Sequence, residues 1–351
     1  MTKRATLSRQ ILARAASGLD RAIMLAVRAA HPPSDDEPNV GTGHEARVQA
    51  LHAIAERFEA LDASAFFPAP RAVEPLARAR GRQGGLDRTD LRWESLAETF
   101  LPELAPRFHE TLENRIALAR LYTRSRPRPL VVLIHGYMMG QLAVDERLWP
   151  LRELDALGFD SALYVLPFHG RRANPRYVGR RPEFPGLDPR FASEGFRQAV
   201  TELRELASLL RRRGHEKVGL FGMSLGGYTA ALTATVEPSL DFLVPIVPLA
   251  SLADFALEQG DLPEAPEPRA REHALLERAF RHVSPVHREP LLRPERVLVL
   301  GGRADRITPI SHARRIASHF RAELATFHGG HVLQWGLGEG FEKVRALLKR
   351  V

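Results

Sequence analysis

The sequence predicts an α/β fold in which a mostly parallel sheet of about eight strands carries helices on both faces. Apolar runs of strand length alternate along the chain with amphipathic patterns of helix length, which is typical of a parallel sheet. The chain has 351 residues, of which 44% are hydrophobic, so it can bury one large core and an accessory subdomain.

Two parts are expected along the chain. Residues 1–65 are predicted to form a helical N-terminal extension, in which two amphipathic patterns flank an acidic, proline-containing linker at 31–39. Residues 66–351 form the α/β domain. Its first strands, around residues 84–85 and at 116–122, are expected to make an antiparallel edge of the sheet.

The remaining strands and helices follow from the apolar pattern. Pro245 and Pro248 predict that the strand at 242–249 is irregular. The expected strands are 129–134, 160–166, 217–221, 242–249, 296–300 and 324–327. The expected helices between and after them are 147–157, 196–213, 225–236, 312–320 and 339–349.

Residues 251–292 form an insertion that is longer than one crossover helix requires. It follows the carboxyl end of a strand, so we expect it to be a lid or cap over a pocket. The alternative is a small helical subdomain that packs for stability. As a lid, it would line a pocket for an acyl chain with its apolar residues, which are Leu252, Phe255, Leu257, Leu275, Leu276 and Phe280.

Composition excludes several classes of function. The chain has no cysteine, which excludes disulfides and thiolate metal sites, and no close histidine spacing predicts zinc. We therefore expect neither a metal nor a cofactor. The formal net charge is +8, but only four of the 50 basic residues are lysine. This excess of arginine indicates codon bias, and no nucleic-acid-binding motif accompanies it, so no nucleic-acid partner is expected.

The N-terminal helix bears on location. No apolar stretch reaches the roughly 20 residues of a membrane span, and Arg14, Asp20 and Arg21 interrupt the apolar core that a signal peptide needs. We expect a cytoplasmic protein. Apolar residues at helical spacing from Ile11 to Val27 favour a helix packed on the main domain. The alternative is peripheral membrane contact, with the basic helix lying on an anionic lipid surface.

A glycine-flanked serine is the most informative functional signal. The segment Gly222-Met223-Ser224-Leu225-Gly226-Gly227 follows an apolar strand pattern and precedes a helical one. This order is typical of a nucleophile elbow, a tight turn that strains the serine backbone and exposes its oxygen. The flanking positions need almost no side chain, because strand and helix nearly touch there. Ser224 is the candidate nucleophile.

An activated serine needs a base, and the base needs an acid that orients it. Asp305 follows the strand at 296–300, at the sheet edge where catalytic groups of open α/β sheets gather, and is the candidate acid. Its alternative role is to cap the helix that begins near Ser311. Asp254, just after the preceding strand, is the rival acid.

The loop after the last strand offers two histidines, His328 and His331. A glycine pair before His331 lets the backbone turn so that its imidazole can reach the serine, and His331 is the candidate base. His328 is expected to end the strand or line the turn. The chain order Ser224, Asp305, His331 is that of α/β hydrolases and differs from the order in chymotrypsin-like or subtilisin-like enzymes.

A glycine-rich turn, His135-Gly136-Tyr137-Met138-Met139-Gly140, directly follows the first parallel strand. Such a turn exposes backbone N–H groups toward the nucleophile. We expect the N–H groups of Tyr137 and Leu225 to form an oxyanion hole, in which each donor contributes about 3 kcal/mol to the stabilisation of the transition state.

From about Phe66 to Val351 the chain resembles the α/β-hydrolase superfamily. Within it, the chain resembles a bacterial group related to the α/β-hydrolase domain-containing protein 18 family. The segments that carry the resemblance are Glu113-Asn114-Arg115, Leu133-Ile134-His135-Gly136, Leu166-Pro167-Phe168-His169-Gly170 and Glu194-Gly195-Phe196-Arg197-Gln198. The resemblance implies the fold, a Ser-His-Asp triad and hydrolysis of an ester bond, but it fixes no substrate.

An arginine-rich loop follows the strand at 160–166. One interpretation places the loop at the rim of the site, where it would bind an anionic group of the substrate. The other is a solvated loop in an arginine-rich chain. His169 is expected to be structural. The arginines are Arg171, Arg172, Arg176, Arg180 and Arg181.

Together these features predict a serine hydrolase that cleaves a small-molecule carboxylic ester of an acyl or lipid type through an acyl-enzyme. Two alternatives stay open. The same triad serves thioesterases and peptidases, and the fold also serves non-catalytic binding proteins. The sequence indicates no oligomeric state.

Overall fold

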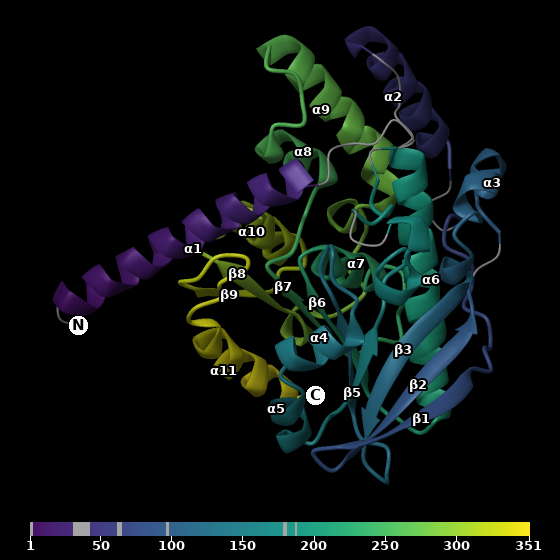
Figure 1. Ribbon diagram of the computed structural model, residues 1–351, viewed down its shortest axis with the longest axis vertical. Coiled ribbons are helices and arrows are strands. Elements are labelled where there is room, and N and C mark those ends of the chain that lie inside the picture. Colours follow the sequence, from purple (N-terminus) through teal and green to yellow (C-terminus); the bar gives the residue numbers. More distant parts are fainter. Residues whose placement is uncertain (1–2, 31–42, 62–64, 96–97, 178–180, 187) are drawn as a thin grey trace.

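The computed structural model describes residues 3–30, 43–61, 65–95, 98–177, 181–186 and 188–351 (Figure 1). The linker expected at 31–39 lies outside these residues. The described strands form one nine-stranded sheet in the order β1-β2-β3-β5-β4-β6-β7-β8-β9. The predicted α/β class, with a mostly parallel sheet, is confirmed.

Six parallel strands form the larger part of the sheet, and all begin and end within four residues of the predicted bounds. Only two residue pairs join β7 and β8, Ile246 with Leu300 and Leu243 with Val297, which fits the irregular run that contains Pro245 and Pro248. The six strands are β4 (Leu130–Ile134), β5 (Asp160–Tyr164), β6 (Val218–Met223), β7 (Phe242–Ile246), β8 (Leu298–Gly302) and β9 (Glu323–Phe327).

The antiparallel edge is also where the sequence predicts it. β1 (Leu76–Gln83) and β2 (Leu86–Glu94) form a hairpin, and β3 (Ile116–Thr123) pairs with both β2 and β5. Gly84 and Gly85 make the hairpin turn with φ of +58° and +83°. A two-residue turn with positive φ at both positions matches the twist of the strands it joins, and glycine adopts it without strain.

Helices cover both faces of the sheet, and successive side chains of a strand point to opposite faces. In β4, Leu130, Val132 and Ile134 belong to one core and Val131 and Leu133 to the other, and all five are fully buried. The first core packs against α6 (Pro189–Arg212), α7 (Leu225–Thr233) and α10 (Ile310–His319). The second packs against α4 (Leu142–Leu148), α5 (Leu151–Ala156) and α11 (Leu337–Leu348).

The insertion and the N-terminal extension meet at one end of the molecule. The insertion contains α8 (Leu252–Gln259) and α9 (Pro266–Phe280), and α9 lies along α2 (His44–Glu59) (Figure 1). Leu275, Leu276 and Phe280 of α9 are buried in the first core. These three side chains therefore stabilise the helical cap. A lid function of the insertion stays a prediction.

Helix α1 (Lys3–Ala30) crosses the carboxyl ends of the strands (Figure 1). It buries Ala16 and Asp20 against the domain, while Leu12, Leu19 and Leu25 stay between 37% and 68% exposed. No helix among the described residues is long and apolar enough to cross a membrane. Contact of the exposed face with a lipid surface stays a prediction.

The segments that carry the family resemblance meet in a buried polar cluster. Asn114 accepts a hydrogen bond from the backbone N–H of Phe168 at 3.0 Å, and its amide donates to Gln198 of α6 at 2.9 Å. The motifs around residues 114, 168 and 198 therefore hold the loop after β5 against α6.

A buried ion pair lies at the centre of this cluster. The two terminal nitrogens of Arg172 each lie 2.6 Å from an oxygen of Glu202 in α6, and both side chains are at most 1% exposed. Ser95, Tyr164 and Gln198 also donate to this carboxylate. Burial opposes the charge of the guanidinium, but the Glu202 carboxylate keeps the pKa of Arg172 above its usual value. The two terminal nitrogens of Arg172 also donate to the carbonyls of Val165 and Asn114, so among the described residues only Nε of this guanidinium lacks a hydrogen-bond partner.

Replacement of Glu202 by glutamine should lower the free energy of unfolding by about 3–5 kcal/mol, because it leaves the Arg172 charge buried without its counter-ion. Urea denaturation followed by circular dichroism measures this loss. The control is Glu342→Gln, which removes an exposed pair with Arg345 and should cost less than about 0.5 kcal/mol. Equal losses in the two variants would contradict a central role for the buried pair.

Candidate active site

Ser224 occupies the turn between β6 and α7, with φ +55° and ψ −117°. A positive φ at a non-glycine residue is the strain expected of a nucleophile elbow. The glycines permit the turn because a Cβ at Gly222 would lie 2.0 Å from the Gly226 oxygen, and one at Gly226 would lie 2.2 Å from the Ile134 oxygen. The packing requirement predicted for these glycines is therefore present in the structure.

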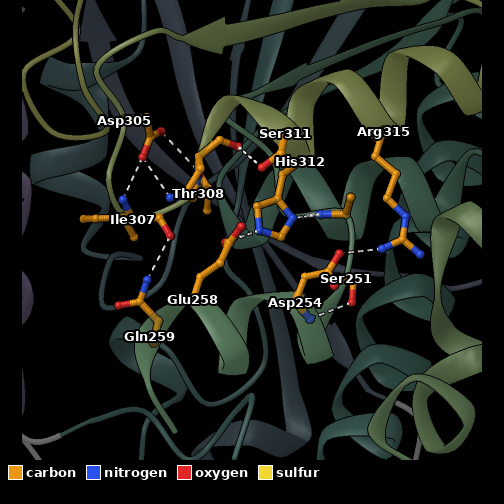
Figure 2. Close-up of polar contacts among 12 residues, drawn as sticks. Ser251, Asp254, Glu258, Gln259, Asp305, Ile307, Thr308, Ser311, His312 and Arg315 are labelled. Atoms are coloured by element: carbon orange, nitrogen blue, oxygen red, sulfur yellow. Dashed lines mark hydrogen bonds and ion pairs between the residues drawn. The ribbon is translucent and has the colours of Figure 1, made fainter. Parts of the chain in front are cut away.

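Asp305 lies in the loop after β8, and hydrogen bonds hold its carboxylate firmly (Figure 2). Oδ1 accepts the backbone N–H groups of Ile307 at 2.9 Å and Thr308 at 2.8 Å. The Thr308 hydroxyl lies 3.0 Å from Oδ2. Helix α10 begins at Ile310 with Pro309 as its N-cap, so Asp305 braces its own loop and does not cap the helix.

His331 meets Asp305 in the loop after β9. Its Nδ1 lies 2.9 Å from Asp305 Oδ2, and the Asp305 side chain is fully buried. A carboxylate only accepts hydrogen bonds, so this contact favours the tautomer in which Nδ1 carries the proton and Nε2 is the acceptor. His328 packs instead against the Trp335 ring, with centroids 5.7 Å apart. The structure thus brings His331, and not His328, to the candidate acid.

The rival acid Asp254 has other partners. It lies on α8, 2.9 Å from His273 Nε2. Figure 2 shows its other ion pair, in which Arg315 Nη1 lies 2.6 Å from the carboxylate. Asp254, His273 and Glu277 are close enough together to hold a metal ion. The Arg315 guanidinium already contacts both carboxylates, 3.4 Å from Glu277, and supplies the positive charge that a cation would bring.

The serine is joined to the base loop indirectly. Gln334 donates to the His331 carbonyl at 3.1 Å and lies 3.6 Å from the sulfur of Met223, the residue before Ser224. Among the described residues, no hydrogen bond connects the Ser224 hydroxyl to the His331 ring. In unliganded hydrolases such a contact often tightens only when substrate binds.

The candidate oxyanion turn lies directly against the nucleophile. A Cβ at Gly136 would lie 3.4 Å from Ser224 Cβ, so the backbone that leads to Tyr137 passes beside the serine. Leu225 is the first residue of α7, where backbone N–H groups have no partner within the helix. The two candidate donors therefore flank Ser224 on separate elements.

Two neutral histidines, His135 and His169, pack beside this turn. His135 accepts the Leu166 N–H at Nε2 (3.1 Å) and donates from Nδ1 to the Gly136 carbonyl (2.8 Å). Burial lowers the pKa of His135 to about 4 and that of His169 to about 3. His169 bonds the Pro167 carbonyl at 2.8 Å, in agreement with the structural role expected from the sequence.

Two arginines of the arginine-rich loop already have carboxylate partners, and an anion site at the other arginines stays a prediction. Arg172 is buried and paired with Glu202, and Arg176 forms an exposed ion pair with Glu110 at 3.1 Å. Arg180 lies outside the described residues. Arg172 thus has a structural role that neither interpretation of the loop anticipated.

Sequence reasoning also missed three polar residues around the candidate pair. Thr308 contacts both the Asp305 carboxylate and, at 2.9 Å, the His331 ring. Gln334 bonds the His331 carbonyl. Asp20 of α1 accepts the His331 N–H at 2.8 Å, although 311 positions separate the two residues. Only the lone acidic residue within an otherwise basic helix could have pointed to Asp20.

The strand order, the elbow at Ser224 and the loops after β8 and β9 define the α/β-hydrolase fold. Solved structures with this fold align with most of the chain. An acetyl xylan esterase from Paenibacillus sp. R4 is 16% identical, with a TM-score of 0.56 over 92% of this chain and 98% of that chain. Acetyl xylan esterase 1 from Thermoanaerobacterium sp. is 17% identical, with a TM-score of 0.55 over 86% and 94%. At these identities the likeness shows the fold alone.

The particular resemblance seen in the sequence is also confirmed. The sequence model of the family described as "Alpha/beta hydrolase domain containing 18" matches residues 195–256, which include most of α6, all of β6 and the elbow. Uncharacterised proteins from two strains of Mycobacterium tuberculosis are 34% identical over 227 residues. That alignment covers 63% of this chain and 54% of each relative, so the chain spans about half the length of the curated relatives it matches.

Replacement of Gly222 by alanine should destroy the elbow, because the new methyl group would lie 2.0 Å from a backbone oxygen that cannot move away. We expect poor folding or a Tm lower by many degrees, measured by differential scanning fluorimetry. Gly338→Ala in α11 is the matched control, since nothing lies within 4 Å of its Cβ position. It should leave Tm unchanged or raise it slightly, as glycine disfavours helices. Similar Tm values for both variants would refute the close contact.

Proposed function

We propose that the protein is a serine hydrolase that cleaves carboxylic esters, with Ser224 as nucleophile, His331 as base and Asp305 as the orienting acid. The observation that carries the proposal is the 2.9 Å contact between His331 Nδ1 and Asp305 Oδ2 on loops next to a strained serine. A binding scaffold has no physical need for this combination.

In the proposed reaction His331 Nε2 takes the hydroxyl proton of Ser224 as the serine oxygen attacks the ester carbonyl. The Asp305 carboxylate keeps Nδ1 protonated and stabilises the imidazolium. The N–H groups of Tyr137 and Leu225 donate to the carbonyl oxygen as it becomes negative. His331 then returns the proton to the departing alcohol, and the acyl group remains on Ser224. Water repeats the sequence and releases the acid.

The choice of an ester rests on two supports. Ester hydrolysis needs no added group beyond this triad and an oxyanion hole, and the two similar solved structures are acetyl xylan esterases. Because those structures show the fold alone, ester cleavage remains our proposal. A panel of p-nitrophenyl esters of graded acyl length, with matching thioesters and anilides, tests it. If the protein cleaves only thioesters or only anilides, the substrate is a thioester or an amide and not an ester.

Ser224→Ala should abolish ester hydrolysis and labelling by a fluorophosphonate probe without unfolding the protein, because alanine fits the elbow. His331→Ala should lower kcat by several orders of magnitude as well, since triad members act as a unit. His328→Ala is the control and should keep most of the activity, because its ring contacts Trp335 and not Asp305. If His328→Ala proves the more damaging change, the assignment of the base is wrong.

Asp305→Asn should lower kcat by about 10⁴-fold, because an amide lets His331 hold the wrong tautomer. Asp254→Asn serves as the matched control and should be mild, since its carboxylate pairs with His273 and Arg315. Steady-state kinetics on one p-nitrophenyl ester compares the two. The reverse ranking would move the acid to α8.

A further inference from the structure

Asp20 of α1 holds both loops of the candidate dyad. Its side chain is fully buried, and its carboxylate accepts three backbone N–H groups. Oδ2 accepts from His331 at 2.8 Å and from Arg306 at 3.1 Å, and Oδ1 accepts from Val332 at 3.0 Å. One carboxylate thus joins the acid loop after β8 to the base loop after β9. Hydrogen bonds to a charged acceptor are about twice as strong as neutral ones.

The surrounding residues are shaped for this contact. Ser17, one turn earlier on the same face of α1, donates to the Ala304 carbonyl at 2.7 Å. A Cβ at Gly330 would lie 2.6 Å from Asp20 Oδ2, so a larger residue there would push the carboxylate away. Gly329 and Gly330 do not have positive φ. The glycine pair before His331 therefore provides space for α1 and for its own loop.

The contact acts on the orientation of the base. The His331 N–H is held by Asp20, its carbonyl by Gln334 and its ring by Asp305. Without the carboxylate, the N–H groups of His331 and Val332 lose their partner, and the base loop loses its link to Arg306.

We propose that Asp20 is a positioning residue for hydrolysis, which makes α1 part of the active site. The inference rests on the proposed function, because it assigns His331 the role of base. Asp20 touches no reacting atom. It fixes the backbone from which the imidazole reaches the serine, and a displacement of about 1 Å at such a position can cost about 100-fold in rate.

Two substitutions at Asp20 should lower kcat to different degrees. Asp20→Ala removes all three acceptor bonds and should lower kcat by about 100-fold with KM changed by less than about threefold. Asp20→Asn has the same shape and keeps one acceptor oxygen, so it can retain the bonds to His331 and Arg306 and should recover much of the rate. A monotonic order from aspartate through asparagine to alanine is the signature of the contact.

Asp160→Asn is the matched control for a general loss of stability. Asp160 is also fully buried and accepts hydrogen bonds from the backbone N–H groups of Arg124 and Arg128. It lies at the amino end of β5, whereas the candidate site lies at the carboxyl ends of the strands. It should lower the urea midpoint and leave kcat unchanged. If Asp20→Ala keeps the kcat of the unmodified protein, or if Asp160→Asn lowers kcat as much, the positioning role is refuted.

A measurement without turnover separates this inference from the proposed function. Backbone hydrogen exchange in the segment 328–334 should become at least tenfold faster in Asp20→Ala, while exchange in β4 should not change. If the unmodified protein neither hydrolyses esters nor reacts with the fluorophosphonate, the proposed function fails, whatever the exchange shows. If it is active but exchange in 328–334 is unaffected by Asp20→Ala, Asp20 does not hold the base loop.

Discussion

The buried pair of Arg172 and Glu202 sets the position of the nucleophile's surroundings through a series of contacts. It fixes the loop after β5 against α6. In that loop, Gly170 touches the turn after β4 so closely that a Cβ would lie 2.0 Å from the Gly140 oxygen. The other end of the same turn, at Gly136, lies against Ser224. A charge pair enclosed in the core thus determines where the candidate oxyanion turn lies. The first step is an ion pair between side chains, the second is a close contact between two backbones, and the third brings the backbone of Gly136 to the Ser224 side chain.

The two halves of the candidate site are held by different forces. The elbow and the turn after β4 are fixed by close backbone packing, which admits glycine alone at several positions. The loops of Asp305 and His331 are fixed by hydrogen bonds to carboxylates, both of which are fully buried. Packing leaves little freedom of movement, whereas hydrogen bonds can break and re-form when a substrate enters. Close packing at Gly329 and Gly330 adds to the hydrogen bonds in the base loop.

Local sequence predicted what local geometry determines. Glycines around Ser224 predicted the elbow because strand and helix need that space, and the position after a strand predicted where Asp305 and His331 lie. The sequence placed the start of α6 seven residues too late, although Asp188 and Pro189 supplied a standard N-cap signal. Arg172 was read as a loop residue because nothing near it in sequence reveals Glu202. Contacts of this kind, and those of Asp20, join residues far apart in sequence, so periodicity and motif spacing carry no trace of them.

The contacts of α1 can form only after the loops that follow β8 and β9 have been synthesised. Asp20 leaves the ribosome early, yet its partners lie 286 to 312 positions further along the chain. At about 5–20 residues per second, synthesis of this stretch takes about 15–60 s. The elbow at Ser224 emerges well before the loop of His331. A nascent chain therefore contains Ser224 for part of this time without His331, and α1 must meet the loops after β8 and β9 before the candidate site is complete.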